Sequence, residues 1–90
     1  MIDLKMELHN KRAAAYDGET LIGECTFSPS PTTWIIDHTT VDGNYRGQGI
    51  ANKLVKLVAD AAREAGVKVM PLCPFAKKEF ERVPEYADLL

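Results

Sequence analysis

Two glycines separated by one residue form the first candidate site in this chain. Gly47 and Gly49 follow a β-branched stretch that ends at Val41, and they precede an amphipathic segment. Glycine leaves the backbone open to a ligand, and the amides that begin a helix have no acceptor within it. Such amides bind anions, so the stretch predicts a phosphate-binding turn. The glycines alone match neither the dinucleotide fingerprint, because residue 52 is asparagine, nor a P-loop, and a flexible loop explains them equally well.

A second candidate site pairs a cysteine with a histidine. Cys73 precedes Pro74, and proline is favoured at the first position of a helix. At such an N-cap the helix dipole and the free amides lower the pKa of a thiol. His38 has a side chain suited to proton transfer near neutral pH. As a pair, Cys73 and His38 would provide a nucleophile and a base, although each taken alone is better explained as an inert buried cysteine and a structural histidine.

Four strands are expected before the glycines. Apolar and polar residues alternate from Ile2 to Leu8, which is typical of a half-buried strand. Asp17-Gly18 between two apolar runs is a hairpin signal, so the alanine-rich residues before it are interpreted as a strand. The expected strands cover residues 2–8, 12–16, 20–27 and 33–41.

Alternation within the last two of these strands predicts which side chains share a face. One face of residues 20–27 is expected to hold Leu21, Gly23, Cys25 and Phe27. One face of residues 33–41 is expected to hold Trp34, Ile36, His38 and Thr40. Because both faces of residues 33–41 carry apolar groups, this strand is expected to be central and covered on both sides.

Helical periodicity begins after the glycines. Apolar residues recur at helical spacing from Ile50 to Ala65, and Gly66 is a natural stop. Residues 67–72 form a short strand, which returns after a helix and is expected parallel to residues 33–41. A second helix is expected from Pro74 to about Arg82, with Phe75 and Phe80 pointing at the core. The sequence thus predicts an α+β fold: a mixed sheet of four antiparallel strands, a helix, a parallel fifth strand and a C-terminal helix.

Size and composition limit the function classes. Ninety residues permit a single domain, residues 1–90, with one modest core. The formal net charge of -2 argues against a nucleic-acid partner. No run is long enough for a signal peptide or a membrane span, so we expect no membrane partner and a cytoplasmic location. Two distant cysteines are too few for a disulfide framework, and no metal-ligand spacing is present.

A longer string makes the meaning of the glycines more specific. Arg46-Gly47-Gln48-Gly49-Ile50-Ala51 matches the pattern [Q/R]-x-x-G-x-[G/A] after a β-branched strand and at the start of a long helix. It closely resembles the acyl-CoA-binding motif of the GNAT superfamily of N-acyltransferases. The resemblance implies that this string holds the coenzyme A pyrophosphate and that the backbone of Thr39, Thr40 and Val41 lines the pantetheine.

Three further strings resemble the small single-domain GNAT subgroup: His38-Thr39-Thr40-Val41, Pro71-Leu72-Cys73-Pro74-Phe75-Ala76 and Pro84-Glu85-Tyr86-Ala87-Asp88-Leu89. The resemblance implies a fifth strand that splays from the fourth and leaves a slot for the thioester. Pro71 fits this, because a strand that leaves its neighbour can lose an amide donor. Phe75 and Lys78 are also expected at the coenzyme, although a solvated face is the favoured explanation of Lys78. Cys73 would lie near the acetyl group, as acyl acceptor or as general acid to the CoA thiolate.

The predicted function is acetyl-CoA-dependent transfer of an acetyl group to an amine. The alternative is a non-catalytic acyl-CoA-binding module or adaptor. A weaker alternative is a domain that binds a nucleic acid or a protein partner through the basic residues of the second helix, Lys77, Lys78 and Arg82, which the acidic balance disfavours. Larger GNAT enzymes carry a helical insertion and C-terminal strands that are missing here. Those parts usually shape the acceptor pocket, so the amine, on a small molecule or a protein, stays undetermined.

Overall fold

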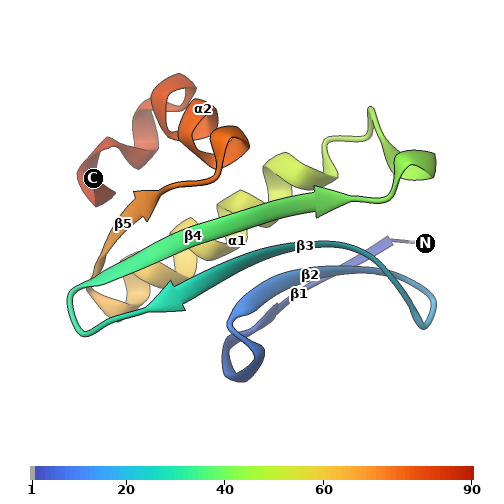
Figure 1. Ribbon diagram of the computed structural model, residues 1–90, viewed down its shortest axis with the longest axis horizontal. Coiled ribbons are helices and arrows are strands. Elements are labelled where there is room, and N and C mark those ends of the chain that lie inside the picture. The colour runs from blue at the N-terminus through green and yellow to red at the C-terminus, as the bar shows by residue number, and fades with distance from the viewer. Residues whose placement is uncertain (1) are drawn as a thin grey trace.

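In a computed structural model that describes residues 2–90, five strands form one sheet in the order β1-β2-β3-β4-β5 (Figure 1). The strands are β1 (Ile2–Glu7), β2 (Arg12–Asp17), β3 (Thr20–Pro29), β4 (Thr33–Val41) and β5 (Lys68–Pro71). Neighbours from β1 to β4 are antiparallel, whereas β5 is parallel to β4. The predicted fold class is confirmed.

Two helices and three 3-10 turns complete the fold. They are η1 (Leu8–Asn10), η2 (Gly43–Tyr45), α1 (Ile50–Ala65), α2 (Pro74–Arg82) and η3 (Pro84–Leu89). The long helix α1 crosses one face of the sheet, while α2 and η3 lie beside β5 (Figure 1). None of the helices in residues 2–90 has the length and apolar character needed to cross a membrane.

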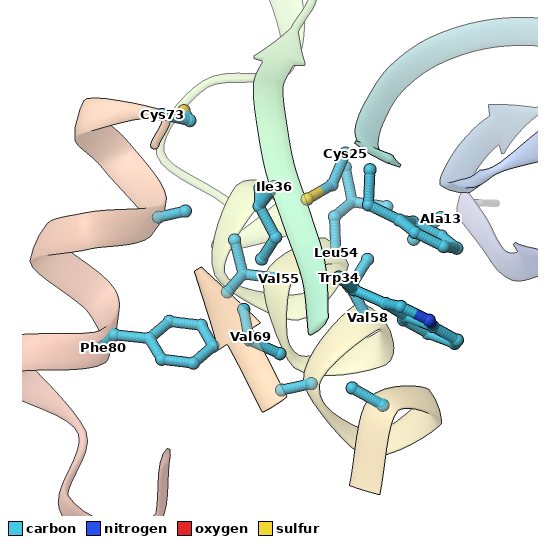
Figure 2. Close-up of a cluster of buried hydrophobic side chains, with 14 of the residues drawn as sticks. Ala13, Cys25, Trp34, Ile36, Leu54, Val55, Val58, Val69, Cys73 and Phe80 are labelled. Atoms are coloured by element: carbon cyan, nitrogen blue, oxygen red, sulfur yellow. The ribbon is translucent and has the colours of Figure 1, made fainter. Parts of the chain in front are cut away.

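The core lies between α1 and the sheet and continues under α2. Leu54 and Val58 of the apolar stripe of α1 are fully buried, as its period predicts, and Val55, which lies outside the predicted stripe, is fully buried as well. Figure 2 shows Val55 of α1 close to Val69 of β5 and Phe80 of α2. The predicted core position of Phe80 is therefore confirmed, and α2 is anchored to β5 through this contact.

A bulge in β3 overturns one expected face. Ala15 pairs with Gly23, but the next residue of β2, Tyr16, pairs with Leu21, so Ile22 has no partner of its own. An extra residue reverses the alternation of side chains beyond it. Ile22 is consequently buried, and Leu21 is 41% exposed, so the predicted common face of Leu21 with Gly23, Cys25 and Phe27 is wrong.

A second bulge, in β4, determines the geometry of the candidate site. Phe27 pairs with Ile36 and Thr26 with His38, which leaves Asp37 as the extra residue. Ser28 Oγ donates to Asp37 Oδ2 over 2.9 Å and holds this side chain. Ile36 is fully buried whereas His38 is exposed, so the predicted common face of these two residues is wrong.

Beyond the bulge, β4 and β5 separate. Their pairing ends with Ile36 and Pro71. The backbone N–H groups of Leu72 and Cys73 both donate to the Ile36 carbonyl oxygen, each over 3.1 Å. Residues 37–41 then continue along β3 alone, while the chain after Cys73 turns into α2 (Figure 1). The predicted splay of the fifth strand is thus present, and Pro71 lies at the point of separation.

The chain ends differ in detail from the sequence expectation. β1 stops at Glu7, and Leu8 is exposed in η1 rather than continuing the strand. The tail after Pro84 forms η3, which buries Tyr86 and Leu89 but leaves Leu90 exposed. Arg63 of α1 holds this tail through hydrogen bonds of 2.9 Å to Asp88 and 2.8 Å to the carbonyl of residue 85.

Candidate active site

The glycine-rich turn forms an open cradle at the start of α1. Gly47 and Gly49 have φ of +81° and +74°, a conformation that side chains disfavour. Gly49 is the N-cap of α1 and has no side chain that could accept from the first-turn amides. No acidic residue occupies that turn either. The amides are therefore left for an external anion, as the motif predicts.

A groove runs from this cradle along the end of β4 to α2. It consists of two adjoining depressions of about 210 and 400 Å³ that share Val41, Arg46, Ala51 and Phe75. We call it the β4–α1 groove. The smaller depression is also lined by Tyr45, Gly47, Gly49, Ile50 and Asn52, and the larger one by Thr39 and Thr40.

The groove brings together most of the residues expected at the coenzyme. Nine of them line it: Thr39, Thr40, Val41, Arg46, Gly47, Gly49, Ile50, Ala51 and Phe75. Gln48 and Lys78 are not among the lining residues. Phe75 is half-buried and forms the α2 wall of the groove. Tyr45 and Asn52 also line the groove but were not predicted to do so. Their position next to the motif is the one sequence signal that could have identified them.

Cys73 lies at the N-cap of α2, where the sequence places it. Its side chain is 7% exposed, and it makes no capping hydrogen bond as a thiol. Burial alone would raise the pKa of Cys73, but hydrogen bonding by Ala76, Thr39 and Phe75 to the sulfur outweighs it, and the net pKa shift is downward. These hydrogen bonds therefore favour the thiolate relative to an ordinary cysteine.

Cys25 provides an internal contrast to Cys73. It is fully buried on β3, directly opposite Thr39, whose hydroxyl donates to its sulfur over 3.5 Å. Burial raises the pKa of the Cys25 thiol to about 11, with only partial relief from Thr39. The pKa of one thiol, Cys73, is thus lowered and that of the other, Cys25, is raised, and Thr39 influences both.

His38 is positioned differently from Thr39. It pairs with Thr26, whereas Thr39 pairs with Cys25, so the two side chains project from opposite faces of β4. Within residues 2–90, His38 makes no side-chain hydrogen bond or ion pair, and the groups that influence the Cys73 thiol are those of Thr39, Phe75 and Ala76. A direct Cys73–His38 hydrogen bond is therefore not observed. The catalytic roles of both residues stay predictions.

Metal ligation has no obvious site in the described part of the chain. No group of three or more His, Cys, Asp or Glu side chains in residues 2–90 could hold a metal ion. Besides the glycine-rich cradle, the polar residues that line the groove are the two threonines, Tyr45, Asn52 and Arg46. This donor set suits an anionic ligand with an extended apolar part.

Comparison with solved structures supports the same fold. A GCN5-like protein from Staphylococcus aureus, studied by NMR, is 31% identical over 97% of this chain and 85% of its own, with a TM-score of 0.76. The ribosomal-protein-alanine N-acetyltransferase of Brucella melitensis is 28% identical over 80% of this chain and 59% of its own, with a TM-score of 0.67.

A third solved structure matches the fold at lower identity. It is a GNAT family N-acetyltransferase from Escherichia coli in complex with CoA, 23% identical over 80% of this chain and 61% of its own, with a TM-score of 0.64. Against the Brucella and Escherichia coli proteins, the chain spans about three-fifths of their length. No match is found among curated protein sequences.

A protein-family model extends the comparison to the sequence itself. The model described as GCN5-related N-acetyl-transferase matches residues 12–89, which include the cradle, Cys73 and the tail. The predicted family and enzyme class are therefore confirmed. The chain belongs to the family of GCN5-related N-acetyltransferases, which use acetyl-CoA as cosubstrate.

Proposed function

We propose that this chain transfers the acetyl group of acetyl-CoA to an amine, with the coenzyme lying in the β4–α1 groove. The observation that supports this is the continuity of the groove: it joins an anion cradle at Gly49 to the end of β4 and to Phe75. The first-turn amides and Arg46 would bind the pyrophosphate. The backbone of residues 39–41, free of β5, would bind the pantetheine amides and direct the thioester toward Cys73.

Cys73 is proposed as the acyl acceptor. Its thiolate attacks the thioester carbonyl, so that a bond from the Cys73 sulfur to the acetyl carbon forms and the bond to the CoA sulfur breaks. CoA leaves as the thiolate. A lowered pKa favours this nucleophilic role over that of a general acid, which would have to be protonated. The backbone amides at the start of α2 that hydrogen-bond to the Cys73 sulfur would also stabilise the developing oxyanion.

The second step transfers the acetyl group to the acceptor. The amine attacks the acetyl carbon, the Cys73 thiolate leaves, and the proton released by the amine goes to a base. His38 is proposed for this role rather than for activation of Cys73, because it is exposed and projects from the face of β4 opposite Thr39. It would receive the proton from the acceptor side of the slot.

The acceptor is proposed to be a primary amine of a peptide or a small molecule. The Brucella protein is named for acetylation of a ribosomal-protein alanine, which makes a peptide with a free N-terminal alanine a reasonable first substrate. A single-domain organisation and a cytoplasmic location also stay predictions.

Two measurements test the proposed function. Calorimetric titration with CoA should show binding, and CoA release from acetyl-CoA should depend on an amine from a panel of an N-terminal alanine peptide, lysine and a polyamine. Cys25→Ser serves as the control variant, because Cys25 lies outside the groove lining. CoA binding without release in the presence of any amine would favour the adaptor alternative. Absence of CoA binding would refute the proposal.

A further inference from the structure

A side-chain hydrogen bond ties the cradle to a distant hairpin. The Tyr45 hydroxyl donates to Asp17 Oδ2 over 2.5 Å, across 28 residues of sequence. Asp17 ends β2 at the turn into β3, whereas Tyr45 ends η2 directly before Arg46. The contact therefore joins the turn of the β2–β3 hairpin to the backbone that leads into Gly47 and Gly49.

Few other hydrogen bonds connect this part of the chain to other elements, although Tyr45 also packs against the core. Tyr45 N–H and Asn44 N–H both bond to Asp42, inside the turn itself. The N–H of Asp42 donates to the Ile22 carbonyl over 2.7 Å, at the bulge of β3. In the described chain, the Tyr45 hydroxyl makes the one side-chain hydrogen bond that connects residues 42–49 to another element.

The two partners differ in their relation to the groove. Tyr45 lines the smaller depression, and its hydroxyl donates to Asp17. Asp17 does not line either depression. The hydrogen bond lowers the pKa of the Asp17 carboxyl and raises that of the Tyr45 hydroxyl, so both groups keep the protonation states that the bond needs near neutral pH.

We propose that Tyr45, held by Asp17, is a positioning residue for coenzyme binding: the hydrogen bond fixes the orientation of residues 46–49 and so keeps the cradle amides directed at the pyrophosphate. This inference rests on the proposed function, because it takes the β4–α1 groove as the coenzyme site. Coenzyme A then binds to a cradle that is already ordered, and less conformational entropy is lost on binding.

The direction in which Asp17→Ala changes CoA affinity distinguishes a positioning role from a direct electrostatic effect. Asp17 is an anion near a site for a polyanion, so by charge alone its removal should tighten CoA binding. If Asp17 acts through Tyr45, its removal should weaken binding instead. The two explanations predict opposite changes for Asp17→Ala.

The test is calorimetric titration with CoA of wild type, Tyr45→Phe, Asp17→Ala, Asp17→Asn and the double variant Tyr45→Phe/Asp17→Ala. We expect each of the first two variants to bind CoA about tenfold more weakly, as for the loss of one net hydrogen bond. The double variant should be no weaker than either single one, because the same bond is lost. Asp17→Asn, which keeps an acceptor oxygen without the charge, should recover most of the affinity.

Tyr16→Phe is the matched control. The Tyr16 hydroxyl donates to Glu7 Oε2 over 2.6 Å, a comparable tyrosine–carboxylate bond that does not involve the cradle. Tyr16→Phe should lower the melting temperature without changing CoA affinity. Tyr45→Phe should weaken CoA binding by more than its effect on the melting temperature explains.

Four outcomes would overturn the inference. Tighter or unchanged CoA binding by Asp17→Ala would remove the positioning role of Asp17. Additive losses in the double variant would mean that Tyr45 contacts the coenzyme independently. Absence of CoA binding by wild type would refute the proposed function together with this inference, whereas normal binding by wild type and equal binding by Tyr45→Phe would refute this inference alone.

Discussion

The backbone N–H of Cys73 donates to the carbonyl oxygen of Ile36 over 3.1 Å. Ile36 is the last residue of β4 that pairs with β5, and Asp37, the extra residue of the bulge, follows it. One carbonyl therefore marks the place where the strands separate and also holds the candidate nucleophile beside the opening. The position of Cys73 is determined by backbone contacts at the end of the paired sheet, so its reactivity can be tested without disturbing the strand pairing.

The two cysteines should differ in alkylation. In native protein, iodoacetamide should modify Cys73 first, at a rate that rises with pH through a midpoint below the ordinary pKa of a cysteine, because hydrogen bonds from α2 and Thr39 favour its thiolate. Cys25 should stay unmodified until the protein unfolds, because it is buried and its pKa is about 11. Peptide mapping by mass spectrometry gives both rates. Equal modification of the two cysteines would contradict this assignment.

Thr39 should be needed for the low pKa of Cys73. Thr39→Val keeps the shape of the side chain but removes the hydroxyl, so the midpoint of Cys73 alkylation should move to higher pH. Thr39→Ser keeps the hydroxyl and should retain a midpoint close to that of wild type. A midpoint that does not respond to Thr39→Val would leave the α2 amides as the sole cause.

The two glycines at the ends of α1 allow a matched comparison of alanine substitutions. Gly49 and Gly66 have φ of +74° and +73°, and neither has a neighbour within 4 Å of an added methyl group. Alanine at either position should cost about 1 kcal/mol of unfolding free energy through backbone strain alone. Gly49→Ala should also weaken CoA binding severalfold, because the cradle amides move, whereas Gly66→Ala should leave CoA affinity intact. Equal CoA affinities of Gly49→Ala and Gly66→Ala would show that the amides at Gly49 do not bind the coenzyme.

Acid should weaken the far edge of the sheet through Glu7. Hydrogen bonds from Tyr16, over 2.6 Å, and from Arg12, over 2.8 Å, lower the pKa of Glu7 from 4.5 to about 2. A lowered pKa adds stability that is fully present above the ordinary pKa and is lost as pH falls through the lowered one. Glu7→Gln should therefore melt below wild type at pH 7, and the difference should close between about pH 5 and 2.

Glu19→Gln is the control for that experiment, because Glu19 is an exposed residue of the β2–β3 turn. It should leave the melting temperature unchanged across the same range. A difference for Glu7→Gln that stays constant with pH would show that the lost stability comes from packing of the side chain rather than from its charge.

Much of the architecture followed from periodicity, because strands and helices repeat their apolar residues at different spacings. The two bulges did not follow, since an alternating pattern cannot reveal an extra residue such as Ile22 or Asp37. The bulge at Asp37 had the largest consequence: it turned His38 away from the face of Ile36 and placed Thr39 opposite Cys25.

As with the fold, only part of the candidate site could be predicted from the sequence. The cradle glycines and the N-cap position of Cys73 were predicted from local sequence, because turns and helix starts have local signals. Contacts between distant segments have none, so the influence of Thr39 on Cys73 and the bond between Tyr45 and Asp17 became visible only in three dimensions.

The central claim is that Cys73 accepts the acetyl group, and intact mass after incubation with acetyl-CoA tests it most directly. Wild type and Cys25→Ser should each gain one acetyl group, Cys73→Ala should gain none, and the added group should disappear when an accepted amine is supplied. Amine acetylation at an undiminished rate by Cys73→Ala, with no acetylated wild-type protein, would contradict the claim and show that the amine attacks acetyl-CoA directly.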